Sequence, residues 1–333
     1  MRIRLRKLPA FRRESCHSIV ILDGKETNLG DLLWLPIEKE GELKVFDDLI
    51  LDEEKIAERI GESEIVITVD VPITAAVMDR CRNIRYIGAM ATGYNHISLA
   101  EAERRGIAVT NVPSYSTSSV SQRAIALLME LSDRVGTLSG KVKNGEWAGP
   151  FPHWEIPSFT LEGKTLGILG YGKIGRRTGE IALALGMKVI AYSRTRQEGQ
   201  EGGIEFVSLS SLLTNSDCIS LHAPLNEDSF HIIRKENIEM MKDGAYIINT
   251  SRGALIDEKD LNEALESRKL GGAALDVLET EPPEKDNPLL SSPYTIVTPH
   301  TAWTGKEARR VLIEETGKNI QAWKNGEWRN RLV

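Results

Sequence analysis

Short apolar runs alternate with longer amphipathic stretches along nearly the whole chain. The runs are rich in β-branched residues and bounded by turn-forming residues, which is typical of strands buried inside a sheet. Strands are predicted at 18–22, 65–69, 86–89, 108–111, 165–169, 188–192, 218–221, 246–249, 273–277 and 295–298. Because strands that alternate with helices usually form parallel sheets covered on both faces, the pattern predicts an α/β, doubly wound architecture.

Two domains are expected. A glycine-rich turn normally opens a nucleotide domain, yet about half of the 333 residues precede the turn at 170–175. We therefore predict a flavodoxin-like substrate (catalytic) domain of residues 18–112 plus 304–333 and a Rossmann dinucleotide-binding domain of residues 113–303, with the active site in the cleft between them. The stretches 119–142 and 305–323 are predicted as long helices that carry the chain between the domains. Residues 1–17 form a basic N-terminal extension, which we interpret as a solvated tail.

Composition excludes several classes of function. The net charge of −6 argues against nucleic acid as a partner, because phosphate backbones are held by dense basic surfaces. No apolar run reaches about 18 residues, so no membrane span is expected. The three cysteines, Cys16, Cys81 and Cys218, are too few and too scattered for a disulfide framework or a zinc site, so we predict no metal and a reducing, cytoplasmic location.

The glycine turn itself predicts a dinucleotide site. Gly170 permits a tight turn, Gly172 lets backbone N–H groups approach a pyrophosphate, and Gly175 lets the next helix pack close to its strand. The N-terminus of that helix presents partial positive charge to the phosphates. The alternative is an ordinary strand-to-helix turn that binds nothing.

Three polar side chains follow the ends of later strands: Arg252, Glu281 and His300. An arginine can grip a carboxylate and polarise a neighbouring carbonyl, and a histidine can transfer a proton near neutral pH. A carboxylate beside the histidine favours the imidazolium and orients the ring. Together these groups predict carbonyl reduction, or the reverse oxidation of a 2-hydroxy acid. The alternative is that each is an ordinary charged or polar surface group.

The other histidines carry weaker signals. His222 follows a strand and is expected to line the cofactor site mainly through its backbone. We interpret His17, His96, His153 and His231 as structural or surface residues.

The combined motifs resemble those of the D-isomer-specific 2-hydroxyacid dehydrogenase family from residue 18 onward. The matching segments are Gly-Tyr-Gly-Lys-Ile-Gly at 170–175, Asn-Thr-Ser-Arg-Gly at 249–253, Leu-Asp-Val at 275–277, Glu-Pro-Pro at 281–283 and Pro-His at 299–300. The resemblance implies that Arg252 binds the substrate carboxylate, that His300 is the acid/base and that Glu281 supports it. It further implies that backbone N–H groups of Thr92 and Gly93 also bind the substrate.

The resemblance also implies a set of cofactor contacts, in which Asp276 holds the nicotinamide amide. The complete set is Thr117, Gly170, Tyr171, Gly172, Lys173, Ile174, Ser193, Arg194, Thr195, His222, Ala223, Pro224, Thr250, Ser251, Arg252, Asp276 and His300.

Within the family, segments such as 22–32, 91–95 and 115–120 resemble the glycerate dehydrogenase (hydroxypyruvate reductase) branch. This likeness implies reduction of hydroxypyruvate or glyoxylate to D-glycerate or glycolate. Two alternatives stay open: a reductase of bulkier 2-keto acids such as phenylpyruvate, and a dinucleotide-sensing, co-repressor-like scaffold without turnover. The family also implies a homodimer, in which segment 147–157 reaches across and Trp154 lies near the partner's substrate cleft.

The cofactor preference is predicted from the segment 192–196, Tyr-Ser-Arg-Thr-Arg. NAD enzymes of this fold usually carry an acidic residue there, which binds the ribose 2′-OH. Without that carboxylate, and with Arg194 and Arg196 available to a 2′-phosphate, NADP(H) is favoured over NAD(H). The alternative is that these arginines only face solvent while NAD(H) is bound.

Overall fold

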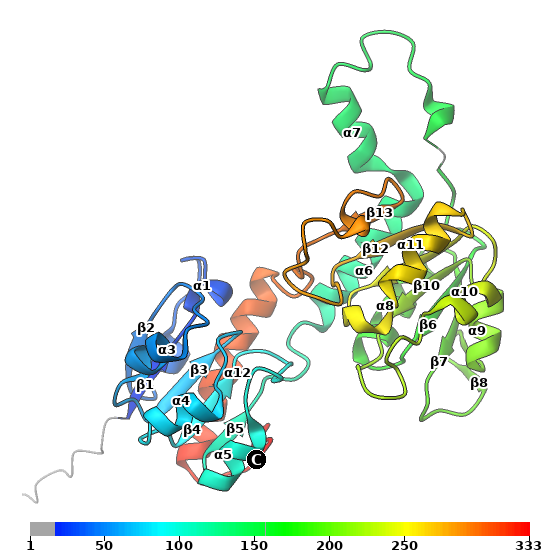
Figure 1. The fold of residues 1–333 in the computed structure, drawn as a ribbon. Helices are drawn as coiled ribbons and strands as arrows, with labels where there is room; N and C mark the ends of the chain where they lie inside the picture. Colours follow the sequence, from blue (N-terminus) through cyan, green and yellow to red (C-terminus); the bar gives the residue numbers. More distant parts are fainter. Residues whose placement is uncertain (1–16, 157) are drawn as a thin grey trace, which may run out of the picture. The chain divides into compact units, whose positions relative to one another are not determined.

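The computed structural model describes residues 17–156 and 158–333, so nearly all of the basic N-terminal extension and Pro157 lie outside it. The chain forms two compact units (Figure 1). Unit 1 contains the described residues up to Tyr115 together with Lys306–Val333, and unit 2 is Ser116–Gly305. No helix within the described ranges is long and apolar enough to cross a membrane.

Unit 1 is built on a five-stranded parallel sheet in the order β2-β1-β3-β4-β5. This is the strand order of flavodoxin-like folds. The strands are β1 (Ser18–Ile21), β2 (Glu42–Val45), β3 (Ile65–Thr68), β4 (Tyr86–Ala89) and β5 (Ala108–Thr110). The helices are α1 (Gly24–Thr27), α2 (Leu35–Glu38), α3 (Glu53–Ile60), α4 (Ala75–Arg80), α5 (Leu99–Arg105) and α12 (Lys306–Lys324). β2 was not predicted from the sequence because two of its four residues are charged, and none of them is fully buried.

Unit 2 carries an eight-stranded sheet in the order β13-β12-β11-β10-β6-β7-β9-β8, in which only β8 is antiparallel to its neighbour. Its strands are β6 (Thr165–Leu169), β7 (Lys188–Tyr192), β8 (Gly199–Glu201), β9 (Ile204–Phe206), β10 (Cys218–Leu221), β11 (Ala245–Asn249), β12 (Leu270–Leu275) and β13 (Thr295–Val297). Its α-helices are α6 (Thr117–Asp133), α7 (Val135–Lys143), α8 (Lys173–Ala184), α9 (Leu209–Asn215), α10 (Lys235–Met240) and α11 (Glu258–Glu266). Short 3₁₀ turns occur at η1 (His153–Glu155), η2 (Gly253–Leu255) and η3 (Pro288–Leu290).

The single helix predicted at 119–142 is wrong. Arg134 adopts a left-handed conformation, with φ of 56°, and divides the stretch into α6 and α7. The Glu130 carboxylate accepts a hydrogen bond at 3.0 Å from the Gly136 backbone N–H and so stabilises the start of the new helix. Many residues of α6 are buried but none of α7 is, because α7 and the loop after it project from the body of unit 2 (Figure 1).

The strand predicted at 273–277 is displaced. β12 begins at Leu270 and ends at Leu275, so Asp276 follows the strand instead of lying inside it. Residues 270–272 were not assigned because Gly271 and Gly272 weaken the strand pattern, although both are buried. Asp276 therefore lies at the carboxyl end of a buried strand, where a polar side chain can serve a site.

The first turn of α12 is tied to the N-terminal part of unit 1 by a nearly buried arginine. The two terminal nitrogens of Arg309 donate to the two carboxylate oxygens of Asp31 at 2.8 and 2.9 Å, and one also donates to the Thr27 carbonyl at 3.0 Å. Arg309 is 4% exposed, and its two hydrogen bonds to the Asp31 carboxylate stabilise the buried positive charge. The Arg309 hydrogen bonds lower the pKa of Asp31 to about 2.

We expect Asp31→Asn to lower the thermal unfolding midpoint at pH 7, because it leaves the Arg309 charge without its anionic partner. The folded pKa of Asp31 lies below the ordinary value of 3.8, so its stabilisation is present above about pH 4 and is lost as the pH falls toward 2. Thermal unfolding of both proteins from pH 7 to pH 2 measures this, and the difference should shrink at the acid end. Glu54→Gln, which breaks an exposed ion pair with Arg80, is the control and should change the midpoint little. Equal midpoints for wild type and Asp31→Asn at pH 7 would refute the assignment.

Candidate functional site

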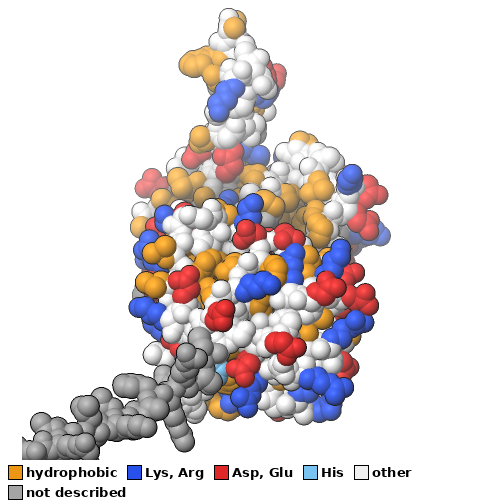
Figure 2. Space-filling model, turned by 90° about the vertical axis from the view of Figure 1, so that its left-hand side faces the viewer, with side chains coloured by type: hydrophobic (Ala, Val, Ile, Leu, Met, Phe, Trp, Pro, Cys, Tyr) orange, Lys and Arg blue, Asp and Glu red, His pale blue; other side chains and the backbone are white. Residues whose placement is uncertain are grey.

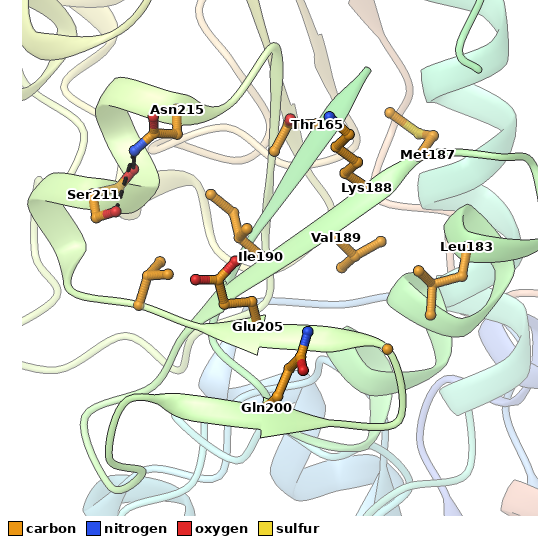
Figure 3. Close-up of a pocket in the computed structure, with 12 residues that line it drawn as sticks. Thr165, Leu183, Met187, Lys188, Val189, Ile190, Gln200, Glu205, Ser211 and Asn215 are labelled. Carbon is orange, nitrogen blue, oxygen red and sulfur yellow. Dashed lines mark hydrogen bonds between the residues drawn. The ribbon is translucent and has the colours of Figure 1, made fainter. Parts of the chain in front are cut away.

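The candidate residues of unit 2 follow the carboxyl ends of its parallel strands, where α/β sheets bind their ligands. A cavity of about 580 Å³ lies elsewhere, beside β6, β7 and β9 (Figure 3). Its lining includes Thr165 and Lys188, the first residues of β6 and β7. This cavity is therefore not the site predicted from the glycine turn and the strand ends.

The glycine turn is shaped by close backbone approaches. Gly170 has φ of 98°, and a Cβ added there would lie 2.5 Å from the backbone nitrogen of Ala223. A Cβ on Gly175 would lie 2.3 Å from the Gly170 carbonyl oxygen, so neither position accepts a side chain. A Cβ on Gly172, the residue before α8, would meet nothing within 4 Å. Open space in front of a helix N-terminus fits a dinucleotide phosphate. Lys173 and Ile174 form the first turn of this helix.

The loop after β10 lies against the glycine turn. The His222 N–H donates to the Leu169 carbonyl at 2.7 Å, and its Nε2 lies 2.9 Å from the Ser220 hydroxyl. Burial lowers the pKa of His222 to about 4, so the ring is neutral at pH 7. The buried Nδ1 of His222 and the buried Oγ1 of Thr250 have no hydrogen-bond partner among the described residues. Unpartnered buried polar atoms at strand ends are suited to contact a polar ligand.

The loop after β7 carries the residues predicted to select the cofactor. The Ser193 and Thr195 hydroxyls lie 3.3 Å apart, and exposed Arg194 is ion-paired with Asp228 of the loop after β10. Arg196 is ion-paired with Glu201, and its guanidinium carbon lies 5.1 Å from the centres of the Tyr171 and Phe206 rings. The β8–β9 hairpin that supplies Glu201 and Phe206 was not predicted from the sequence.

The Asp276 carboxylate holds the segment that carries His300. Asp276 is 1% exposed, and its Oδ2 accepts the Ala302 N–H at 2.7 Å while its Oδ1 accepts the Thr301 N–H at 3.2 Å and the Thr298 hydroxyl. Its backbone carbonyl accepts the His300 N–H at 2.7 Å. A carboxylate has about four acceptor positions, and these contacts occupy three of them. The cofactor contact predicted for Asp276 stays a prediction.

The structure brings His300 and Glu281 together. Nδ1 of His300 lies 2.6 Å from Oε2 of Glu281, and Oε1 of Glu281 accepts the Leu278 N–H at 2.9 Å. The Glu281 hydrogen bond raises the pKa of His300 further than burial lowers it. Burial opposes ionisation of Glu281, but its hydrogen bond to His300 holds the pKa of Glu281 below its ordinary value. The pair therefore favours an imidazolium beside a carboxylate.

Arg252 acts electrostatically on the same pair. Its charge acts to lower the pKa of both Glu281 and His300. The turn that carries it is fixed by Asn249, whose side-chain nitrogen donates to the Arg252 carbonyl at 2.8 Å and whose side-chain oxygen accepts the Ser251 N–H at 3.0 Å. The Ser251 hydroxyl donates to the Leu221 carbonyl at 2.9 Å. Asn249 was assigned no role from the sequence. The signal that could have identified it is an asparagine at the end of an apolar strand, since asparagine side chains often bond to the backbone of a following turn.

The remaining predicted residues lie farther along the chain. Thr92 and Gly93 follow β4 in unit 1, where the Thr92 hydroxyl donates to the Val112 carbonyl at 3.2 Å. Thr117 begins α6 in unit 2, and Ala223 and Pro224 follow His222. The contacts predicted for these residues with substrate or cofactor stay predictions. In the described part of the chain, no group of three or more His, Cys, Asp or Glu side chains could hold a metal ion.

A parallel sheet with a glycine-shaped turn before a helix defines unit 2 as a dinucleotide-binding α/β unit. Comparison with known proteins agrees: residues 125–302 match the family described as D-isomer specific 2-hydroxyacid dehydrogenase, NAD binding domain. The chain is 45% identical over 312 residues to a hydroxypyruvate reductase of Blautia hydrogenotrophica, covering 92% of this chain and 97% of the relative.

Other relatives agree with this family. The chain is 36% identical over 301 residues to a glyoxylate reductase of Korarchaeum cryptofilum, covering 89% of this chain and 91% of the relative. The apo-structure of an Escherichia coli D-lactate dehydrogenase superposes with a TM-score of 0.83 at 30% identity, covering 95% of this chain and 100% of the other. The chain therefore belongs to the D-isomer specific 2-hydroxyacid dehydrogenase family, and its cofactor is a nicotinamide dinucleotide.

We expect Glu281→Gln to lower the pKa of His300, because an amide cannot stabilise the imidazolium as a carboxylate does. An NMR titration of the His300 ring in the protein without substrate measures the change. Glu284→Gln, which removes an exposed carboxylate three residues further along the chain, serves as the control and should leave the wild-type titration nearly unchanged. An unchanged His300 titration in Glu281→Gln would contradict the pairing.

Proposed function

We propose that this protein reduces hydroxypyruvate or glyoxylate to D-glycerate or glycolate, using the hydride of a reduced nicotinamide cofactor. The observation that carries the proposal is the 2.6 Å contact of His300 with Glu281, beside Arg252. The names of the relatives, hydroxypyruvate reductase and glyoxylate reductase, support this choice of substrates.

His300 is proposed as the acid in this reduction. Its Nδ1 is engaged by Glu281, so Nε2 is the nitrogen left to face a substrate. A bound reduced nicotinamide would supply the hydride for the carbonyl carbon. His300 gives its Nε2 proton to the carbonyl oxygen, which becomes a hydroxyl. The raised pKa of His300 keeps the proton on the ring to a higher pH. In the reverse oxidation, the neutral ring accepts the same proton.

Arg252 is proposed to hold the substrate carboxylate. Its guanidinium presents parallel N–H donors, which suit a planar carboxylate better than a lysine does. One of its terminal nitrogens donates to the Ser251 carbonyl at 2.7 Å, which restricts the orientation of the group. The substrate is thereby placed with its carbonyl oxygen toward His300, and this orientation accounts for part of the rate enhancement.

His300→Ala and Arg252→Ala are expected to fail in different ways. Loss of the proton donor should lower kcat for hydroxypyruvate roughly 10²- to 10⁴-fold, while the Kd of NADPH stays within about twofold. Loss of Arg252 should chiefly raise KM for the keto acid. Steady-state kinetics with hydroxypyruvate, glyoxylate and phenylpyruvate, together with cofactor titration by fluorescence, separate these effects.

Three outcomes of that substrate panel would count against the proposal. Wild-type kcat for His300→Ala across the pH range refutes the acid/base role. Higher kcat/KM with phenylpyruvate than with hydroxypyruvate favours the reductase of bulkier keto acids. Cofactor binding without oxidation of NADPH by any small 2-keto acid favours the sensing scaffold.

We propose NADP(H) as the preferred cofactor. The loop after β7 carries no carboxylate at positions 192–196. Half-buried Ser193 and exposed Arg194 and Thr195 offer hydroxyl and guanidinium donors there. A 2′-phosphate would meet these donors without a repelling acidic residue at the usual position. Arg194 pairs with exposed Asp228, and such surface pairs exchange partners at little cost.

Wild-type enzyme should show higher kcat/KM with NADPH than with NADH. Arg194→Ala should lower kcat/KM for NADPH roughly tenfold and leave that for NADH nearly unchanged, because only the 2′-phosphate contact is lost. Arg177→Ala, which breaks an exposed ion pair with Glu180 on α8, is the matched control. Equal or better efficiency with NADH in the wild type would overturn the preference.

We also propose a homodimer formed through unit 2. The arm made of α7 and residues 144–156 carries exposed apolar side chains, with Trp147 68% and Trp154 71% exposed. Hydrophobic side chains are visible on this projecting arm in Figure 2. Large exposed aromatic residues of this kind are typical of interfaces between subunits.

A further inference from the structure

The carboxylate that contacts His300 lies on a short turn after β12, and this turn is held from several sides. The Glu279 N–H donates to Oε1 of Glu258, at the start of α11, at 2.6 Å. A Cβ added to Gly253 would lie 1.9 Å from the carbonyl carbon of Leu278, so the turn after β11 lies directly against it. The position of Glu281 therefore depends on neighbouring loops as well as on its own bond to the Leu278 N–H.

His231 provides another attachment, through the Glu279 side chain. Its Nε2 lies 3.1 Å from Oε1 of Glu279, and its Nδ1 lies 3.4 Å from Oδ2 of Asp257, the residue that caps α11. The ring of His231 therefore lies between the residue that caps α11 and the turn. Glu279 precedes Glu281 by two residues, so the contact with His231 acts on the same turn.

The backbone at His231 is unusual. Its φ of 47° lies in the left-handed region, which a few per cent of residues other than glycine adopt, with asparagine, aspartate and histidine the most frequent among them. The His231 N–H donates to the Ala254 carbonyl at 2.9 Å, and its ring stacks on Phe230 with centroids 3.9 Å apart. A strained conformation fixed by these contacts holds the ring where it meets Glu279.

Electrostatics gives this contact a further effect. The carboxylates of Asp257, Glu258, Glu279 and Glu281 belong to the turn or to the start of α11 beside it. Repulsion among them favours movement of the turn away from α11. The hydrogen bonds of the Glu279 N–H to Glu258 and of the Glu279 side chain to His231 oppose that movement.

We propose that His231 is a positioning residue for the reduction: by holding Glu279, it fixes the turn from which Glu281 contacts His300. This inference rests on the proposed function and extends it beyond the residues of the family motifs. The charged groups that act on His300 come from three places: Glu281 on the turn, Asp276 at the end of β12, and Arg252 after β11. His231 contacts the turn, through Glu279, and its effect on His300 is therefore transmitted by Glu281.

The test uses His231→Asn and the nearly isosteric Glu279→Gln in the full-length protein. An NMR titration should show that the His300 pKa falls in both variants, because Glu281 is held less firmly beside the ring. In hydroxypyruvate reduction, which needs the protonated ring, the decline of kcat/KM at high pH should move to lower pH. At pH 8 the loss in kcat/KM should be roughly threefold to tenfold, while the Kd of NADPH stays within about twofold.

The matched control is His17→Asn. His17 forms a comparable pair in unit 1, with its Nδ1 2.7 Å from Oε2 of Glu64, so its loss should leave the His300 titration unchanged. Glu279→Gln preserves the backbone contact with Glu258 and therefore tests the idea even where His231→Asn folds poorly. Thermal unfolding of each variant identifies such a case.

The outcomes distinguish this inference from the proposed function. If the wild type reduces keto acids and neither variant moves the His300 titration or the pH profile, the role of His231 is refuted. If both variants move the titration but the wild type reduces no keto acid, the linkage between His231 and His300 holds while the proposed reaction fails. A loss of activity at all pH values with no change in the His300 titration indicates a merely structural residue and also refutes the inference.

Discussion

The candidate site depends on one buried carboxylate. Asp276 is held at the end of β12 and uses its side chain and its backbone carbonyl to fix the segment from Thr298 to Ala302. His300, within that segment, has φ of 51°, a conformation that costs energy for a residue with a side chain. The hydrogen bonds of Asp276 offset that cost. The orientation of the His300 ring is therefore determined by the buried carboxylate of Asp276, which precedes it by 24 residues.

A second constraint is the close approach of backbones at the strand ends. Gly170 lies against the loop after β10, and Gly253 lies against the turn after β12. Each contact leaves no room for a Cβ, so neighbouring loops are held at fixed separations. As a result, three strand ends bring together Arg252, Glu281 and His300. The arginine charge lowers the pKa of His300, and the Glu281 carboxylate raises it.

Much of this arrangement could be predicted because the relevant signals are local. Parallel strands such as β6, β7 and β10 are short apolar runs, and the structure places them at the predicted residues. β2 and the β8–β9 hairpin were missed because the apolar signal is too short: β2 and β9 carry two apolar residues each, and β8 carries none. The break at Arg134 was missed because a left-handed arginine has no sequence signature. The contact between His231 and Glu279 joins residues 48 apart, and only the tertiary fold brings them together.

Unit 1 is assembled from both ends of the chain, and this has a consequence for biosynthesis. Its strands precede unit 2, whereas α12, which contains Arg309, and the residues paired with β5 come last. In α12, Gly317 lies so close to Pro36 that a Cβ would approach its carbonyl oxygen to 2.4 Å. Unit 2 is continuous and can be completed while the nascent polypeptide is still on the ribosome. Unit 1 must wait for the synthesis of α12 and the residues after it, so its apolar strands stay without their final cover until unit 2 has been made.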